Sequence, residues 1–479
     1  MLTRLTITLL GVVTAAAALG CAGPLDGERD AFDRPPRHIA RPAYASEAER
    51  RGDTSRERAA APLPAEPTLL DYLRYAAAHN PGLEAAFHDW QAALHRVPQA
   101  RALADPELSY RYVIHAMNER QAVGLSQMLP WYGRLRAGGD AATARARAAE
   151  ARFDVELRRL RYEVKTAWAE YAYLARALAV MRESLAIAEQ LEAAARSRFE
   201  AGGGAWADVV QAQLAAQQLA DEIETLAATR EPTVAQLNAA LGRRADLPLP
   251  WPGRAPSMRE FALDEATLLA RLAEANPELA ALAHDTVGER HELRVARLNR
   301  VPELMLGVEY MQMPDAQDAV GLMASINLPV WGGRTSAERA EALARFGAAS
   351  LRRSDRLYEL QADARLAWSR HRDARRRVER YDETLIPMAH EALAASETAY
   401  AQGAVAFEAI SRAQAALQEL RLTRERLAVD AFDAAARIEQ LIGGAVTEAA
   451  GRAGGVRTDG DGSNLDAEPE SASPGEEPE

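Results

Sequence analysis

The sequence predicts a mainly α-helical protein that also supplies strands to a membrane β-barrel. Three observations lead to this fold class. One structural unit occurs twice in the chain, each unit carries apolar stripes of helical spacing that run for dozens of residues, and each unit contains two alternating segments of about ten residues. Each unit is therefore expected to run as a helix, a β-hairpin and two long coiled-coil helices.

The duplication is visible in matched positions that stand 196 to 201 residues apart. A separation that drifts by only five residues indicates small loop insertions within one repeated architecture. The matched positions are Asn80 and Asn276, Pro106 and Pro302, Arg134 and Arg334, Trp168 and Trp368, and Phe199 and Tyr400.

Composition and motif order divide the chain into six segments. The segments are an export signal at 1–21, an extended segment at 22–66, a first repeat at 67–242, a linker at 243–262, a second repeat at 263–443, and an acidic, disordered tail at 444–479.

The long helices give the strongest signal. From Arg134 to Glu200, apolar residues alternate at spacings of three and four, which is the pattern of a coiled-coil seam. At 1.5 Å per residue this is roughly 100 Å of helix. The same stripe returns 200 residues later. Gly202 and Gly403 interrupt the two stripes, so each long helix is expected to turn back there as a hairpin.

Four strands are expected, at 108–115, 123–129, 304–311 and 320–328, each alternating between apolar and other residues. Their length is that of strands that cross a bilayer at a tilt. Four strands cannot close a barrel, and an open edge is excluded in lipid. Several chains must then share one barrel; two chains would give eight strands and three would give twelve.

Composition excludes several classes of function. The chain has 479 residues, a net charge of −12, one Cys and a single lysine, Lys165. One Cys rules out a disulfide framework and a cysteine-based metal centre within the chain. The acidic balance argues against nucleic acid as a partner. No nucleophile elbow, phosphate loop or zinc-helix motif is present, so we expect no enzyme activity, no resident metal and no cofactor.

The first residues indicate export. Arg4 precedes an apolar run that ends in small residues before Cys21, which is the layout of a secretory signal. The ending resembles a bacterial lipobox, and Cys21 is then the expected lipidation site. The alternative is an ordinary signal cut near Gly20 that leaves a free thiol.

The duplicated helix–hairpin–long-helix unit behind a signal with a Cys resembles the TolC-type outer membrane efflux proteins, over roughly residues 68–443. The resemblance implies a homotrimer whose twelve-stranded barrel sits in outer membrane lipid and whose twelve-helix tube crosses the periplasm. It also implies two protein partners, a periplasmic adaptor and an inner-membrane transporter. The chain would be the exit duct of such a tripartite pump.

The resemblance places the periplasmic tip and its gate at the two helical hairpins. Tyr400 falls where the family has a gating tyrosine, and Asp208 falls where it has a tip aspartate. The family's basic residue after Gly403 is replaced by Val405, so we expect closure by packing and by acidic residues more than by Arg–Asp pairs. The candidate tip residues are Phe199, Gly202, Asp208, Tyr400, Gly403 and Glu408.

The strands also provide candidates for the barrel lumen. Three methionines are expected on the lumen face, where they could line a path for soft metal ions or simply fill space. Heavy-metal ions are the preferred cargo on this ground, and drugs and secreted polypeptides are the alternatives. The candidate lumen residues are Arg111, His115, Met305, Glu309, Met311 and Met323. The competing hypothesis for the whole chain is a periplasmic coiled-coil scaffold or adaptor without a pore.

Overall fold

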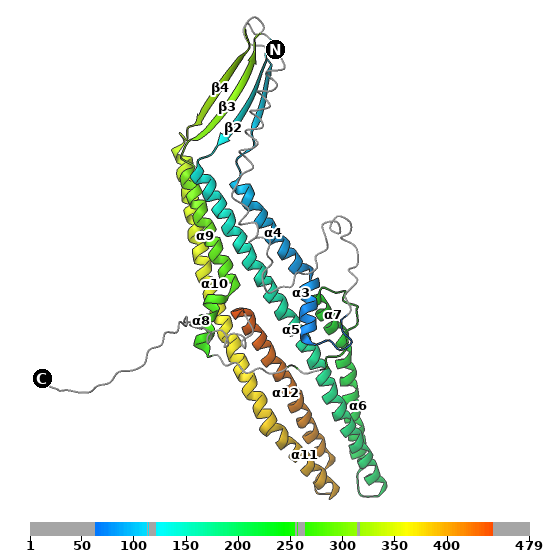
Figure 1. Ribbon diagram of the computed structural model, residues 1–479. Coiled ribbons are helices and arrows are strands. Elements are labelled where there is room, and N and C mark those ends of the chain that lie inside the picture. Colours follow the sequence, from blue (N-terminus) through cyan, green and yellow to red (C-terminus); the bar gives the residue numbers. More distant parts are fainter. Residues whose placement is uncertain are drawn as a thin grey trace, which may run out of the picture.

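The computed structural model describes residues 63–112, 114, 121–253, 256, 264–313 and 317–443. The molecule is elongated, with a β-sheet at one end, two helical hairpins at the other, and long helices between them (Figure 1). The expected export signal, Cys21 and the acidic segment 444–479 lie outside the described residues.

The two repeats have the same order of elements. The first contains α3 (Leu69–His79), α4 (Pro81–Arg101), β1 (Glu107–Tyr112), β2 (Gln121–Leu129), α5 (Tyr132–Glu200), α6 (Trp206–Ala228) and α7 (Arg230–Leu241). The second contains α8 (Glu265–Ala275), α9 (Pro277–Leu298), β3 (Glu303–Gln312), β4 (Ala319–Asn327), α10 (Gly332–Arg380), the π-helix η2 (Tyr381–Leu385), α11 (Ile386–Ala401) and α12 (Phe407–Ile442).

The repeated Asn-Pro pair has a structural cause. The side-chain oxygen of Asn80 accepts hydrogen bonds from the first backbone N–H groups of α4, and its amide donates to the carbonyl of Ala240 at 3.0 Å. Asn276 caps α9 in the same way and donates to the carbonyl of Leu441 at 2.9 Å. Each Asn thus satisfies one helix start and one helix end, and the following Pro needs no partner at the first helical position.

The predicted long helix is confirmed: α5 runs without interruption for 69 residues. The turns after the long helices occur at the predicted glycines. Gly202 has φ 78° and Gly403 has φ 76°, values that favour glycine because it has no Cβ.

The second repeat differs from the first in the helix that follows the β-hairpin: α5 is continuous, whereas η2 separates α10 from α11. Pro387 has no N–H to donate within the helix, and just before it the Ile386 N–H bonds the carbonyl of Tyr381, which is an i→i−5 bond. The matched residue of the first repeat is Ile187, and α5 continues straight through it. The sequence pattern did not indicate this π-helix.

The core follows the repeats. One apolar cluster joins α3, α5 and α7 around Tyr72, Val164 and Leu237, and a second joins α8, α10 and α12 around Leu272 and Leu360. A third cluster lies toward the hairpin end and includes Tyr400, Phe407 and Ile410. Trp168 packs in the first cluster and Trp368 against the second, as expected for tryptophans inside coiled-coil helices.

All four strands are formed, in one antiparallel sheet of order β1-β2-β3-β4. The central β2–β3 pair joins the two repeats, with Val123 opposite Tyr310 and Leu129 opposite Leu304. Strands β1 and β4 are the edges of the sheet. Among the helices of the described part of the chain, none has the length and apolar character of a membrane span.

Candidate functional site: the hairpin tip and the faces of the sheet

The two helical hairpins meet at the side chain of Tyr400. Its hydroxyl donates a 3.4 Å hydrogen bond to Asp208 of the other hairpin, and its ring packs edge-on against Phe407. Tyr400 is only 7% exposed. The structure therefore brings together the predicted tyrosine and aspartate, and adds an aromatic partner from the start of α12.

Arg198 holds this contact in place, and sequence reasoning missed it. Its guanidinium donates to the backbone carbonyl of Tyr400 and, at 3.1 Å, to that of Gly203 in its own hairpin. Its Cζ also lies 4.5 Å from the centroid of the Tyr400 ring, a cation–π geometry. The cation that contacts Tyr400 therefore comes from the first hairpin. The available signal was an arginine four residues before the predicted Gly202 turn.

The glycine turn of the second hairpin makes room for this arginine. A Cβ on Gly403 would stand 3.1 Å from Nη2 of Arg198, and the positive φ of this residue already disfavours any other side chain. Gly403 therefore serves both the turn and the contact between the hairpins.

The remaining predicted tip residues lie outside this contact. Phe199 pairs with Trp206 within the first hairpin, with ring centroids 5.3 Å apart. Glu408 was expected to help close the tip, but its carboxylate pairs with Arg412 at 2.5 Å along α12, and both side chains are exposed. An i,i+4 pair on one helix satisfies Glu408 locally, so within the chain it does not join the hairpins.

The electrostatic setting of Tyr400 is consistent with a closed contact. Burial raises the pKa of its hydroxyl above the ordinary value, the carboxylate of Asp208 raises it further, and Arg198 opposes the shift. At neutral pH the hydroxyl is therefore protonated and available as a donor to Asp208.

At the opposite end, the strand register separates two chemically different faces. One face carries large apolar side chains that are exposed to solvent in the single chain. A large exposed apolar face of this kind normally contacts another protein or a membrane. The exposed apolar residues on this face include Leu108 (73%), Tyr110 (64%), Val320 (69%), Leu322 (89%) and Ile326 (60%).

The other face carries small, polar and methionine side chains, and it holds the predicted lumen residues. Arg111 of β1 reaches across β2 to Glu309 of β3, with 2.8 Å between nitrogen and oxygen. Gly124 lies opposite both Ser109 and Glu309, and a Cβ there would stand 2.7 Å from Oγ of Ser109.

The three methionines share this face, as predicted. Met305, Met311 and Met323 occupy it by register, and the Cε atoms of Met311 and Met323 lie beside Gly321 and Gly307. His115, the remaining lumen candidate, lies outside the described residues. Within the described residues, no group of three or more His, Cys, Asp or Glu side chains is placed to hold a metal ion.

An elongated helical subunit with an amphipathic sheet at one end and paired hairpins at the other has the fold of a subunit of outer membrane channels. Residues 73–243 match the sequence model of the family described as outer membrane efflux protein. The matched residues lie in the first repeat, which is therefore similar to this family. No curated protein sequence matches it significantly.

Solved structures extend the similarity of fold through the second repeat. The outer-membrane channel OprN matches with a TM-score of 0.68 at 18% identity, over 78% of this chain and 90% of that one. The outer membrane protein VceC of Vibrio cholerae matches with 0.66 at 18% identity, over 78% and 96%. The open state of the MtrE channel of Neisseria gonorrhoeae matches with 0.65 at 17% identity, over 79% and 89%.

Proposed function

We propose that the protein is the outer membrane exit duct of a tripartite efflux pump, and that three copies share one twelve-stranded barrel. The observation that carries the proposal is the sheet. Its exposed face is apolar, its opposite face is polar, and both of its edge strands lack a partner within the described residues of the chain.

Lipid explains all three properties of the sheet. An apolar outer face and a polar inner face are the pattern of transmembrane barrel strands. Unpaired strand edges cannot remain in a bilayer, because each backbone N–H and C=O group needs a partner there. Pairing β4 of one copy with β1 of the next closes the edges, and three copies give the twelve strands that the family resemblance implies.

The tip supports a duct that opens and closes. At the tip, Arg198 and Asp208 contact Tyr400 through polar groups, and these contacts can be exchanged for water at modest cost. The hairpins also meet through the apolar cluster that contains Ala212, Tyr400 and Ile410. A periplasmic adaptor that binds the separated hairpins more tightly than the joined ones would shift the tip toward the open state. An inner-membrane transporter would then deliver cargo to the open duct.

The alternative is a periplasmic scaffold without a pore. It accounts for the helices but leaves the apolar face of the sheet without a role. A scaffold of this kind would be recovered in the soluble periplasmic fraction rather than in the outer membrane.

The deciding experiment is the native mass of the full chain extracted in mild detergent from isolated outer membranes. A protein mass near three times that of the processed chain, followed by single-channel conductance in planar bilayers, is the expected result. A monomer recovered from the soluble periplasmic fraction would overturn the duct and favour the scaffold.

A further inference from the structure

A cationic surface on α10 has no role in the proposed duct. Six of the eleven residues from 370 to 380 are arginines, and only Asp373 and Glu379 oppose them. We call this set the arginine band; its members are Arg370, Arg372, Arg375, Arg376, Arg377 and Arg380.

The fold does not require the arginine band. The first repeat builds the same helix, with Trp168 matching Trp368, yet only one of its six corresponding residues is an arginine. The residues that correspond to the band are Glu170, Ala172, Ala175, Arg176, Ala177 and Val180. The cluster of positive charge is therefore a feature of the second repeat alone.

Nearby acids do not neutralise the band. Arg376 pairs with Asp373 at 2.6 Å, but within the described part of the chain no ion pair is formed by Arg370, Arg372, Arg377 or Arg380. Neighbouring like charges on one helix are destabilising, so these guanidinium groups favour an external anion.

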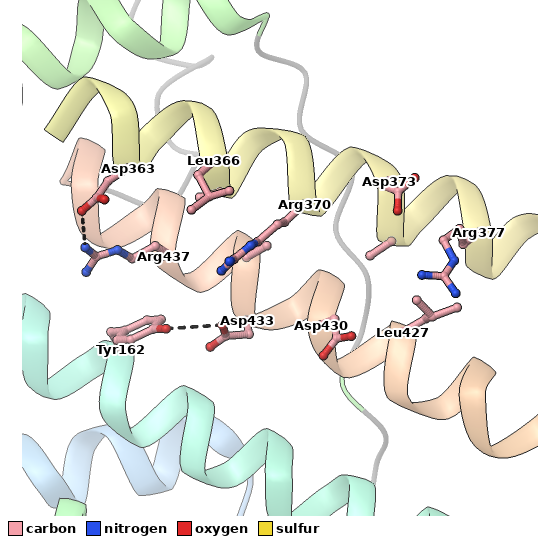
Figure 2. A pocket seen from close by; sticks show the side chains of 13 residues that line it. Tyr162, Asp363, Leu366, Arg370, Asp373, Arg377, Leu427, Asp430, Asp433 and Arg437 are labelled. Atoms are coloured by element: carbon pink, nitrogen blue, oxygen red, sulfur yellow. Dashed lines mark hydrogen bonds and ion pairs between the residues drawn. The ribbon is translucent and has the colours of Figure 1, made fainter. Parts of the chain in front are cut away.

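Two of these arginines extend into a groove between α10 and α12 that also reaches Tyr162 of α5 (Figure 2). Its volume is about 480 Å³, and Arg370 and Arg377 line it.

The acids that line this groove already have partners. Asp363 pairs with Arg437 at 2.8 Å, Asp430 pairs with Arg426 at 2.9 Å, and Asp433 accepts a 2.7 Å hydrogen bond from Thr166. The groove therefore offers unsatisfied cations rather than unsatisfied carboxylates.

We propose that the acidic segment of this same chain, residues 456–479, binds the arginine band. The segment carries eight acids against one arginine, a net charge of −7, and the eleven residues of the band carry a net charge of +4. Aspartate and glutamate carboxylates bind guanidinium groups in a bidentate fashion, so the acidic segment and the arginine band are complementary in charge and in chemistry.

The chain can reach the band. His371 contacts the carbonyl of Ala431 and Asp363 pairs with Arg437, so α10 and α12 are antiparallel and the middle of the band lies near Arg426. That height is sixteen residues before the end of α12, which is roughly 24 Å of helix. Sixteen residues, 443–458, precede the first acid of the segment, and in extended form they span about 50 Å.

The single lysine allows a direct test by carbodiimide cross-linking, which joins a lysine amine to a carboxylate in contact with it. The full chain would carry Arg372→Lys or Arg377→Lys, which keep the charge. Arg176→Lys is the matched control, because Arg176 is exposed, forms no ion pair in the described residues, and lies on α5 at the same height. Lys165 already contacts Glu439, so their cross-link reports successful reaction in every sample.

We expect the new lysines at 372 and 377 to link to acids between 459 and 479, and the lysine at 176 not to do so. The links should be lost in about 1 M salt, where the screening length falls to about 3 Å, while the Lys165–Glu439 link remains. Absence of links from 372 and 377 beside a normal Lys165–Glu439 link would overturn the proposal, and would leave the band to an acidic surface of another protein. Equal linking from 176 would also overturn it, because it would mean contact without preference.

Discussion

Arg198 of the first hairpin donates a hydrogen bond to the carbonyl of Tyr400 in the second and lies over its ring, with 4.5 Å from Cζ to the ring centroid. One side chain thus joins two hairpins that are 202 residues apart in the sequence. Because the same guanidinium also bonds the carbonyl of Gly203, the contact fixes the turn of its own hairpin as well.

Arg198→Ala should open the tip. It removes a cation–π contact and charge-assisted hydrogen bonds, together worth about 2–3 kcal/mol. Cells that express the variant should become more susceptible to a large antibiotic that the outer membrane normally excludes, and single channels should conduct more. Arg196→Ala is the control, since within the described residues Arg196 makes only an exposed i,i+4 pair with Glu192. An equal leak from both variants would remove Arg198 from the gate.

Replacing Tyr400 and Asp208 together should also raise the leak, and by less than the loss of Arg198. The hydroxyl–carboxylate distance of 3.4 Å indicates a weak hydrogen bond, and Tyr400→Phe with Asp208→Asn leaves the ring and its packing in place. The leak assay would show whether this pair belongs to the gate. No change in leak from the double variant would exclude it.

Arginine substitutions on the two faces of the sheet should distinguish the lipid-facing side from the lumen-facing side. Leu322 and Met323 are adjacent in β4 and lie on opposite faces. In the barrel, Leu322→Arg would put a charge into lipid, at a cost of about 2–4 kcal/mol near the bilayer midplane, whereas Met323→Arg would face water. We expect the first variant to lose membrane-inserted oligomer and the second to retain it, as measured by native mass in detergent. Equal insertion of both would contradict the assignment of the faces.

Tyr72 should make stability depend on alkaline pH. Complete burial raises its pKa from 10 to about 12. The unfolded chain releases this proton near pH 10, so the stabilisation is present below pH 10 and is lost as pH rises to about 12. Tyr72→Phe should reduce the fall in unfolding free energy between pH 10 and 12 by up to about 2–3 kcal/mol. Denaturant titrations at pH 8 and pH 11.5 would measure the unfolding free energy of both proteins. An equal loss of unfolding free energy between these two pH values in both proteins would refute the raised pKa of Tyr72.

The methionine face allows a test of the cargo. Replacing Met305, Met311 and Met323 with leucine preserves volume and removes the thioether ligands that soft metal ions prefer. If the duct passes such ions, cells with the triple variant should become more sensitive to Cu(I) or Ag(I) while their drug sensitivity stays unchanged. Unchanged metal sensitivity would assign these methionines to packing.

Much of the fold was predictable because its signals are local. The spacing of apolar residues from Arg134 to Glu200 predicted a helix that the structure confirms as α5, and the alternation around Met305 and Met311 predicted which side chains share a face. Glycine at 202 and 403 marked the turns. Each of these features depends on residues within a few positions of one another, where periodicity and backbone conformation suffice.

The sequence by itself determined the duplicated architecture, the long helices and the strands, and its family resemblance pointed to Tyr400 and Asp208. Only the tertiary structure decided that Arg198 is the cation at Tyr400, that Glu408 turns to Arg412, and that β2 pairs with β3 to make one sheet from two repeats. The physical reason is distance along the chain. A pair such as Arg198 and Tyr400 forms only after two long hairpins have packed side by side, and their relative height is fixed by the summed packing of α5 against α12 rather than by any local pattern.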